Sequence, residues 1–86
     1  MDKLRLLIVS PEKAIFEGDA ERVFVRTLNG DIAILPRHID FAAALGSGNA
    51  KFIVEGNEKR ARINGGLIQV SDNRVRILTN DFTWNE

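Results

Sequence analysis

Polar and apolar residues alternate along most of this chain, and turn-forming residues interrupt the alternation at regular intervals. In the run Glu21–Leu28, Val23, Val25 and Thr27 would all face one side of a strand. Gly, Asn, Asp or Pro recurs about every ten residues, the spacing of short strands in a β-sandwich or barrel. We therefore expect an all-β, antiparallel fold in which eight or nine short strands are visible from the residues alone.

Three turn signals predict hairpins in this fold. Asn29-Gly30 would supply the two positive-φ residues of a type I′ turn, Gly56-Asn57 would close a second hairpin, and Asp72-Asn73 a third. Gly46-Ser47-Gly48 is expected to be a flexible connection between strands. The segment 37–45 lies between Pro36 and this connection, and is expected to form either a helical turn or two, or a loop that leads into a short strand.

Length and composition limit the remaining possibilities. A chain of 86 residues has room for one domain, 1–86. Twelve Lys and Arg balance twelve Asp and Glu, so the basic excess of a dedicated nucleic-acid binder is missing. The absence of Cys excludes disulfides and thiolate chemistry. Apolar runs such as 6–9 are far below the ~18 residues that a membrane helix needs, so we expect a soluble domain that meets a membrane only through a partner.

Catalytic chemistry has little support in this sequence. His38 is the only His, and a triad drawn from Ser10, His38 and Asp40 lacks the G-x-S-x-G turn that would expose a nucleophile. The acidic pairs Asp31/Asp40 and Glu12/Glu17 could act as paired carboxylates in glycoside chemistry, but we expect them to be solvated residues at strand ends. One His without Cys is too few for a metal centre. We expect no catalytic residue, no metal and no cofactor.

A different class of function remains open through the arginines. Arg60, Arg62, Arg74 and Arg76 alternate on neighbouring predicted hairpins and would line one sheet face if those strands are adjacent. The alternative hypothesis is therefore a small β-barrel module that binds oligonucleotide or carbohydrate through this face. No stacking aromatic residue stands between the arginines, which favours a plain solvated face instead.

Several motifs, taken in order, resemble the ε subunit of F-type ATP synthases, and specifically its N-terminal β-sandwich. The resemblance runs from Leu4 to about Thr79. Its carriers are Ser10-Pro11-Glu12, Phe16-x-Gly18, Val23-x-Val25-x-Thr27, Gly30-x-x-x-Ile34-Leu35-Pro36-x-His38, Leu45-x-x-Gly48, Gly65-Gly66-Leu67-x-x-Val70 and Asn73-x-Val75-x-Ile77-Leu78.

This resemblance implies a two-sheet β-sandwich of about ten strands, five in each sheet. It also implies a non-catalytic rotor subunit that links the γ subunit to the membrane c-ring and reaches the α/β catalytic head only indirectly. Ion-driven rotation would thereby be coupled to ATP synthesis or hydrolysis. The implied location is peripheral, on the cytoplasmic side of a bacterial inner membrane, and no nucleic acid is implied as a partner.

The family's contact residues are carried over by position. The hairpin tip Asn29-Gly30-Asp31 matches the loop that faces the c-ring, with Asp31 as its acidic residue. The implied γ-facing residues are Ser10, Phe16, His38, Ile39, Asp40, Phe41, Ala42 and Leu45. Physical arguments agree, because a tight hairpin presents a fixed charge and an apolar segment offers area to bury.

Three departures from the family pattern stand out. Ala33 replaces a common Gly, and Arg37-His38-Ile39-Asp40-Phe41 replaces the common Gly-His-Ala-Pro-Leu, a variant that resembles an alternative, often sodium-translocating branch. The sequence given ends where the family's C-terminal helical hairpin would begin. We therefore expect coupling without the self-inhibition and ATP binding associated with that hairpin.

Overall fold

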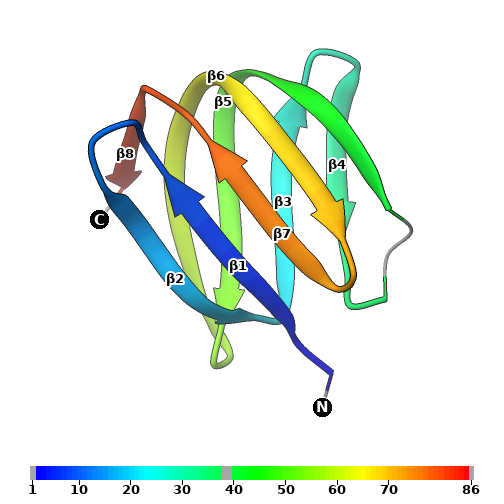
Figure 1. The fold of residues 1–86 in the computed structure, drawn as a ribbon. Helices are drawn as coiled ribbons and strands as arrows, with labels where there is room; N and C mark the ends of the chain where they lie inside the picture. The colour runs from blue at the N-terminus through cyan, green and yellow to red at the C-terminus, as the bar shows by residue number, and fades with distance from the viewer. Residues whose placement is uncertain (1, 38–39, 86) are drawn as a thin grey trace.

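The computed structural model describes residues 2–37 and 40–85 as an all-strand fold (Figure 1). The described residues form eight strands: β1 (Leu4–Val9), β2 (Ala14–Ala20), β3 (Arg22–Thr27), β4 (Gly30–Ile34), β5 (Phe41–Val54), β6 (Asn57–Ser71), β7 (Arg74–Leu78) and β8 (Phe82–Asn85). Within the described ranges, the structure contains no helix of the length and apolar character needed to span a membrane.

Hydrogen bonds join the strands into one sheet that folds over on itself. The strand order is β2-β1-β7-β6-β5-β3-β4, and β8 pairs with β6. The two longest strands, β5 and β6, run through both layers, as Figure 1 shows. Their first and second halves have different neighbours, so each layer contains five strand segments. The expected two-layer β-sandwich is therefore confirmed.

The layers are defined by the pairing register. The first layer contains β2, β1, β7, the second half of β6 and the first half of β5. The second layer contains β4, β3, the second half of β5, the first half of β6 and β8. At the crossing, Leu45 pairs with Gly66 and Ser47 with Asn64, which leaves Gly46 opposite Gly65. Glycines thus stand on both strands where the hairpin bends.

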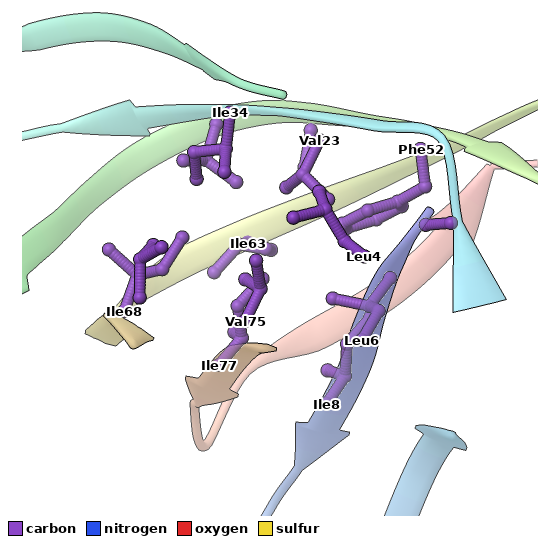
Figure 2. Close-up of a cluster of buried hydrophobic side chains, with 14 of the residues drawn as sticks. Leu4, Leu6, Ile8, Val23, Ile34, Phe52, Ile63, Ile68, Val75 and Ile77 are labelled. Carbon is purple, nitrogen blue, oxygen red and sulfur yellow. The ribbon is translucent and has the colours of Figure 1, made fainter. Parts of the chain in front are cut away.

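The core lies between the layers, and alternate residues from both layers fill it (Figure 2). Leu4, Leu6 and Ile8 of β1 meet Val23 of β3 and Phe52 of β5, and all five are 0–1% exposed. Full burial of each such side chain stabilises the fold by about 1.5–3 kcal/mol. The expected facing of Glu21–Leu28 is confirmed, because Val23, Val25 and Thr27 are buried.

An aromatic cluster closes the core beside β8. The Trp84 ring lies edge-on to Phe82, Phe52 and Phe16, at centroid distances of 4.8, 6.0 and 6.3 Å. Such edge-to-face contacts add to the energy of burial. The last described residues therefore form a strand that covers the open side of the sandwich between β2 and β6.

Two expectations about the strands are wrong. The fold is not antiparallel throughout, because β1 and β7 pair in parallel, with Leu6 beside Val75 and Ile8 beside Ile77. Gly46-Ser47-Gly48 is not a connection between strands but part of β5. This strand begins at Phe41, so it also includes residues 41–45 of the segment 37–45. The strands number eight because the two strands that cross between layers are continuous.

The turns follow the sequence signals with shifts in position. Asp72 and Asn73 have φ of 52° and 61°, as a type I′ turn requires. The second hairpin turns at Glu55-Gly56, one residue earlier than expected, with φ of 52° and 76°. The first turns at Leu28-Asn29, because Thr27 pairs with Gly30, and only Gly30 of the expected pair has positive φ. The predicted type I′ turn at Asn29-Gly30 is therefore wrong.

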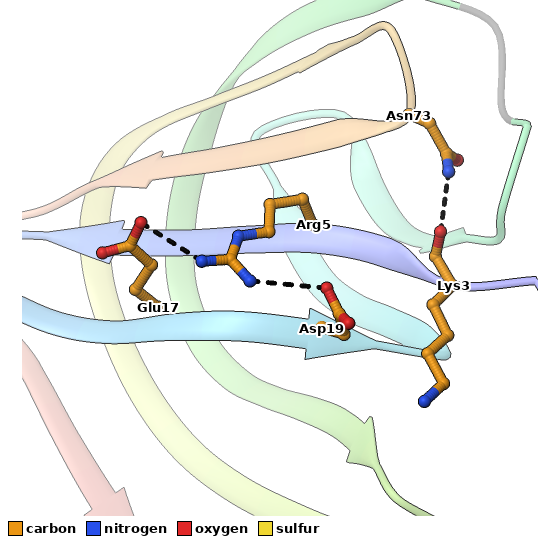
Figure 3. Close-up of polar contacts among 5 residues, drawn as sticks. All are labelled: Lys3, Arg5, Glu17, Asp19 and Asn73. Carbon is orange, nitrogen blue, oxygen red and sulfur yellow. Dashed lines mark hydrogen bonds and ion pairs between the residues drawn. The ribbon is translucent and has the colours of Figure 1, made fainter.

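Polar contacts hold the edge strand and the start of the chain in place (Figure 3). The Arg5 guanidinium on β1 lies between two carboxylates of β2, 3.3 Å from Glu17 and 3.5 Å from Asp19. The Asn73 side chain donates a 2.6 Å hydrogen bond to the Lys3 carbonyl. It also accepts a 2.9 Å hydrogen bond from the Arg37 N–H. Asn73 thus links the β6–β7 turn to two segments distant in the sequence.

Candidate functional site

The tip of the β3–β4 hairpin is exposed and held by its own side chains. The Thr27 hydroxyl donates to the Gly30 carbonyl (2.8 Å) and accepts from the Asn29 N–H (3.1 Å). Leu28 at the tip is 72% exposed, the most exposed of the large apolar residues described. The expected c-ring-facing residues therefore stand together at one end of the sandwich.

Asp31 at this tip is paired across the hairpin. The Arg26 Nε and Nη2 atoms lie 2.9 and 3.3 Å from its two carboxylate oxygens, in a two-point contact. Both side chains are more than half exposed, so the pair contributes at most about 1 kcal/mol to folding. The carboxylate has a fixed orientation and remains accessible to a partner.

An exposed apolar row, here called the leucine patch, crosses the outer face of the first layer at the same end. It consists of Val9 on β1, Leu78 on β7, Leu67 on β6 and Ala44 on β5, which are successive cross-strand partners. Leu67 is 57% and Leu78 47% exposed. Four adjacent strands span roughly 14 Å. Apolar area gathered in this way is typical of a protein interface.

Ser10 lies beside the leucine patch. Together with Val9 and Pro11 it borders a hollow of about 340 Å³ whose opposite wall includes Leu67 and Leu78. Its hydroxyl donates to the Lys13 carbonyl (3.3 Å) and accepts from the N–H groups of Glu12 and Lys13. The hydroxyl therefore shapes the β1–β2 turn, which forms the rim of the hollow.

The other residues expected to face γ are distributed over the fold. Ala42 is exposed on the same outer face as the leucine patch, opposite Gln69. Phe16 lies on β2, at the opposite edge of the first layer from β5. Its ring contacts Trp84 of β8. Leu45 is only 4% exposed and belongs to the core. The structure thus brings Ser10 and Ala42 to one face and separates Phe16 from them.

The remaining members of that set are Phe41, the first residue of β5, and the three residues that precede it in the sequence. Asp40 accepts a 3.3 Å hydrogen bond from the Asp72 N–H, which ties it to the β6–β7 turn. Phe41 is half-buried and packs against the core. His38 and Ile39 lie outside the described residues, so the expected contacts of these two stay predictions.

The predicted single face of arginines is wrong. Arg60 and Arg62 belong to the first half of β6, on the outer face of the second layer, whereas Arg74 and Arg76 lie on β7, on the outer face of the first. The bend in β6 at Gly65 separates the two pairs. Among the described residues, no three His, Cys, Asp or Glu side chains lie close enough together to hold a metal ion.

Comparison with known proteins assigns the chain to a family. Residues 3–85 match the β-sandwich domain of the ATP synthase delta/epsilon chain. The chain belongs to this family. It is 36% identical over 78 residues to the ATP synthase epsilon chain of Shouchella clausii, and 33% identical over 87 residues to that of Ruminococcus albus. It spans 59% and 65% of those two epsilon chains.

Other relatives extend the comparison. The epsilon chain of Frankia casuarinae is 38% identical over 76 residues, which are 89% of its length. In the structure of Euglena gracilis mitochondrial ATP synthase, one chain superposes with a TM-score of 0.91 over 98% of this chain and 54% of its own length, at 22% identity. A chain in the structure of the Tetrahymena thermophila mitochondrial ATP synthase central stalk and c-ring superposes with a TM-score of 0.80, at 20% identity. The match covers 94% of this chain and 66% of that one. These superpositions show that chains of these two ATP synthase complexes share the fold.

The sequence analysis did not predict the leucine patch. Leu67 and Leu78 occupy positions in phase with exposed polar residues, such as Gln69 and Arg76. An apolar residue in the polar phase of a strand is a usable signal, because such a side chain is exposed on the outer face of the sheet. Their alignment across β6 and β7 requires the register, which the sequence does not display.

Proposed function

We propose that this chain is a non-catalytic central-stalk subunit of an F-type ATP synthase, which binds the γ subunit and the membrane c-ring. The observation that carries this proposal is the family match over residues 3–85. It would couple rotation to ATP synthesis or hydrolysis as part of a membrane-associated complex, peripheral to the cytoplasmic side of a bacterial inner membrane. The α/β catalytic head would be reached only through γ.

The arrangement of the two exposed surfaces supports this role. The Leu28 N–H at the hairpin tip donates a 3.0 Å hydrogen bond to the carbonyl of Ala44 in the leucine patch. The tip and the patch are therefore contiguous at one end of the sandwich, while facing different directions. A subunit that must contact a stalk and a ring together needs two such adjoining surfaces.

We assign one partner to each surface by chemistry. The leucine patch offers apolar area suited to a stable interface with γ, with Ser10 and Ala42 at its margins. The tip, Asn29-Gly30-Asp31, presents an oriented carboxylate suited to the polar loops of a c-ring. The hairpin fixes this charge in space, so recognition does not require the loop to become ordered on binding.

Calorimetric titration of this chain into its cognate γ subunit tests the assignment. Leu78→Asp is the test variant and Leu35→Asp the control, because both side chains are 47% exposed and Leu35 lies outside the patch. We expect 1:1 binding with a negative ΔCp, weakened at least about tenfold by Leu78→Asp and little changed by Leu35→Asp.

The other outcomes are decisive as well. If folded γ binds neither the parent chain nor the control, the central-stalk function is wrong for this chain. If Leu35→Asp weakens binding more than Leu78→Asp does, the function stands, but γ binds near the segment after β4 rather than the leucine patch.

A further inference from the structure

An open groove of about 910 Å³ lies on the outer face of the second layer, opposite to the leucine patch. One wall comes from the β3–β4 hairpin and the other from the first half of β6. Its floor is the part of β5 from Ser47 to Lys51. Here β5 pairs with β6 but leaves β3, since no β3–β5 pair occurs between Thr27↔Leu45 and Phe24↔Lys51. The bend of β5 into the other layer therefore opens the groove.

Four cationic side chains line this groove: Arg26, Lys51, Arg60 and Arg62. They come from three different strands that the fold brings together. Asp31 is the only acidic residue that lines the groove in the part of the chain that the structure describes. In a chain with formal net charge zero, this is a local concentration of positive charge.

The acidic partners nearby do not neutralise the groove. Arg26 is paired with Asp31, and the single Glu58 carboxylate serves both Lys51, at 3.8 Å, and Arg60. Arg62 has no ion pair among the described residues. Among the described residues, four cations against two carboxylates leave an excess of two positive charges, which an anion in the groove would balance.

Two of these cations are held in position before any ligand binds. The Lys51 ammonium lies 4.7 Å from the centroid of the Phe24 ring, a cation–π contact that orients it. The Arg26 stem lies across Gly48, where a β-carbon would come within 2.9 Å of its Cδ. Gly48 thus allows Arg26 to lie flat along the wall. Preorganised cations lose less side-chain entropy when they bind an anion.

We infer that this groove binds a phosphate monoester, either a phosphorylated small molecule or a lipid headgroup of that chemistry. A phosphate monoester carries about −1.5 to −2 charge at pH 7, which matches the excess of two positive charges, and its oxygens suit the planar guanidinium. The half-buried Phe24 in the lining offers apolar surface to the attached organic group. This inference does not depend on the proposed partners of the chain.

Titration of the chain with glycerol 3-phosphate at low salt, followed by backbone and arginine side-chain NMR, tests the inference. We expect saturable shifts confined to Gly48, Lys51, Arg62 and their neighbours, which weaken as salt screens the charges. Glycerol serves as the neutral control. In parallel, binding to phosphatidylcholine vesicles with and without phosphatidic acid tests the lipid source. Binding to glycerol 3-phosphate supports a soluble ligand, and binding to phosphatidic acid vesicles alone supports a lipid headgroup.

Matched variants separate the groove from general charge effects. Arg62→Ala should weaken binding about tenfold, whereas Arg74→Ala, the same change on the other layer, should not. Glu58→Gln should strengthen binding about threefold by releasing Lys51 and Arg60, whereas Glu12→Gln should have no effect. The inference is overturned if neither probe binds, or if Arg62→Ala and Arg74→Ala have equal effects.

Discussion

At the scale of single residues, Gly66 is the position where the backbone leaves least room for change. Its φ is 128°, and a β-carbon there would lie 2.2 Å from the Leu78 carbonyl oxygen. The Gly65 carbonyl beside it accepts a 2.8 Å hydrogen bond from the buried Thr79 hydroxyl. These contacts join β6 to the end of β7 at the point where β6 passes between layers.

Gly66→Ala should therefore destabilise the fold by at least about 3 kcal/mol, through backbone strain and steric overlap together. Gly56→Ala is the control, because Gly56 also has positive φ, of 76°, but an added β-carbon meets no described atom within 4 Å. We expect it to cost about 1 kcal/mol, the strain alone. Urea unfolding of both variants measures the difference. Equal losses would mean that the close approach to Leu78 is relieved at little cost.

The sequence predicts single residues well where local geometry decides them. The alternation of Val23, Val25 and Thr27, and the turn at Asp72-Asn73, depend only on neighbouring residues, and both predictions are confirmed. The ion pair of Asp31 with Arg26 depends on the hairpin register, which differs from the predicted one because the turn lies at Leu28-Asn29. A local signal such as Asn29-Gly30 fits more than one turn, and the strands on either side decide between them.

At the scale of elements, β8 is the shortest of the strands described and has the highest fraction of aromatic residues. It has four residues and pairs only with β6. Its attachment depends on Phe82 and Trp84, whose rings contact Phe52 and Phe16. Because Trp84 is the only Trp in the chain, its fluorescence reports specifically on β8.

We expect Trp84→Ala to cost about 2–3 kcal/mol, less than a fully buried Trp, because Trp84 is half-buried. Thermal unfolding of this variant measures the loss. In the parent chain, Trp84 emission should shift to longer wavelength in the same transition as the loss of β-sheet circular dichroism. A shift at clearly lower temperature would show that β8 detaches before the sandwich unfolds.

Elements that cross the whole molecule are the ones that the sequence did not predict. Gly46 and Gly48 resemble a connection, yet β5 continues through them because they are where it bends between layers. The parallel pairing of β1 with β7 joins residues about seventy positions apart, and turn signals report only on adjacent strands. Long-range pairing is set by packing of the two layers, which no local motif encodes.

At the scale of the whole molecule, the fold distributes its surface chemistry by layer. The first layer carries the leucine patch, the second carries the cationic groove, and the hairpin tip adjoins the patch at one end. The turn of the β5–β6 hairpin lies at the other end of the sandwich (Figure 1). Segregation of this kind gives one small domain chemically different surfaces that face in different directions.

Cysteine cross-linking in the assembled ATP synthase tests the central claim most directly, because the chain has no Cys of its own. Leu67→Cys, Asn29→Cys and Glu55→Cys place one thiol on the leucine patch, on the hairpin tip and on the distant β5–β6 turn. We expect the first to cross-link to γ, the second to a c subunit and the third to neither. Cross-links from Glu55→Cys to γ or c, with none from the other two, would contradict the account.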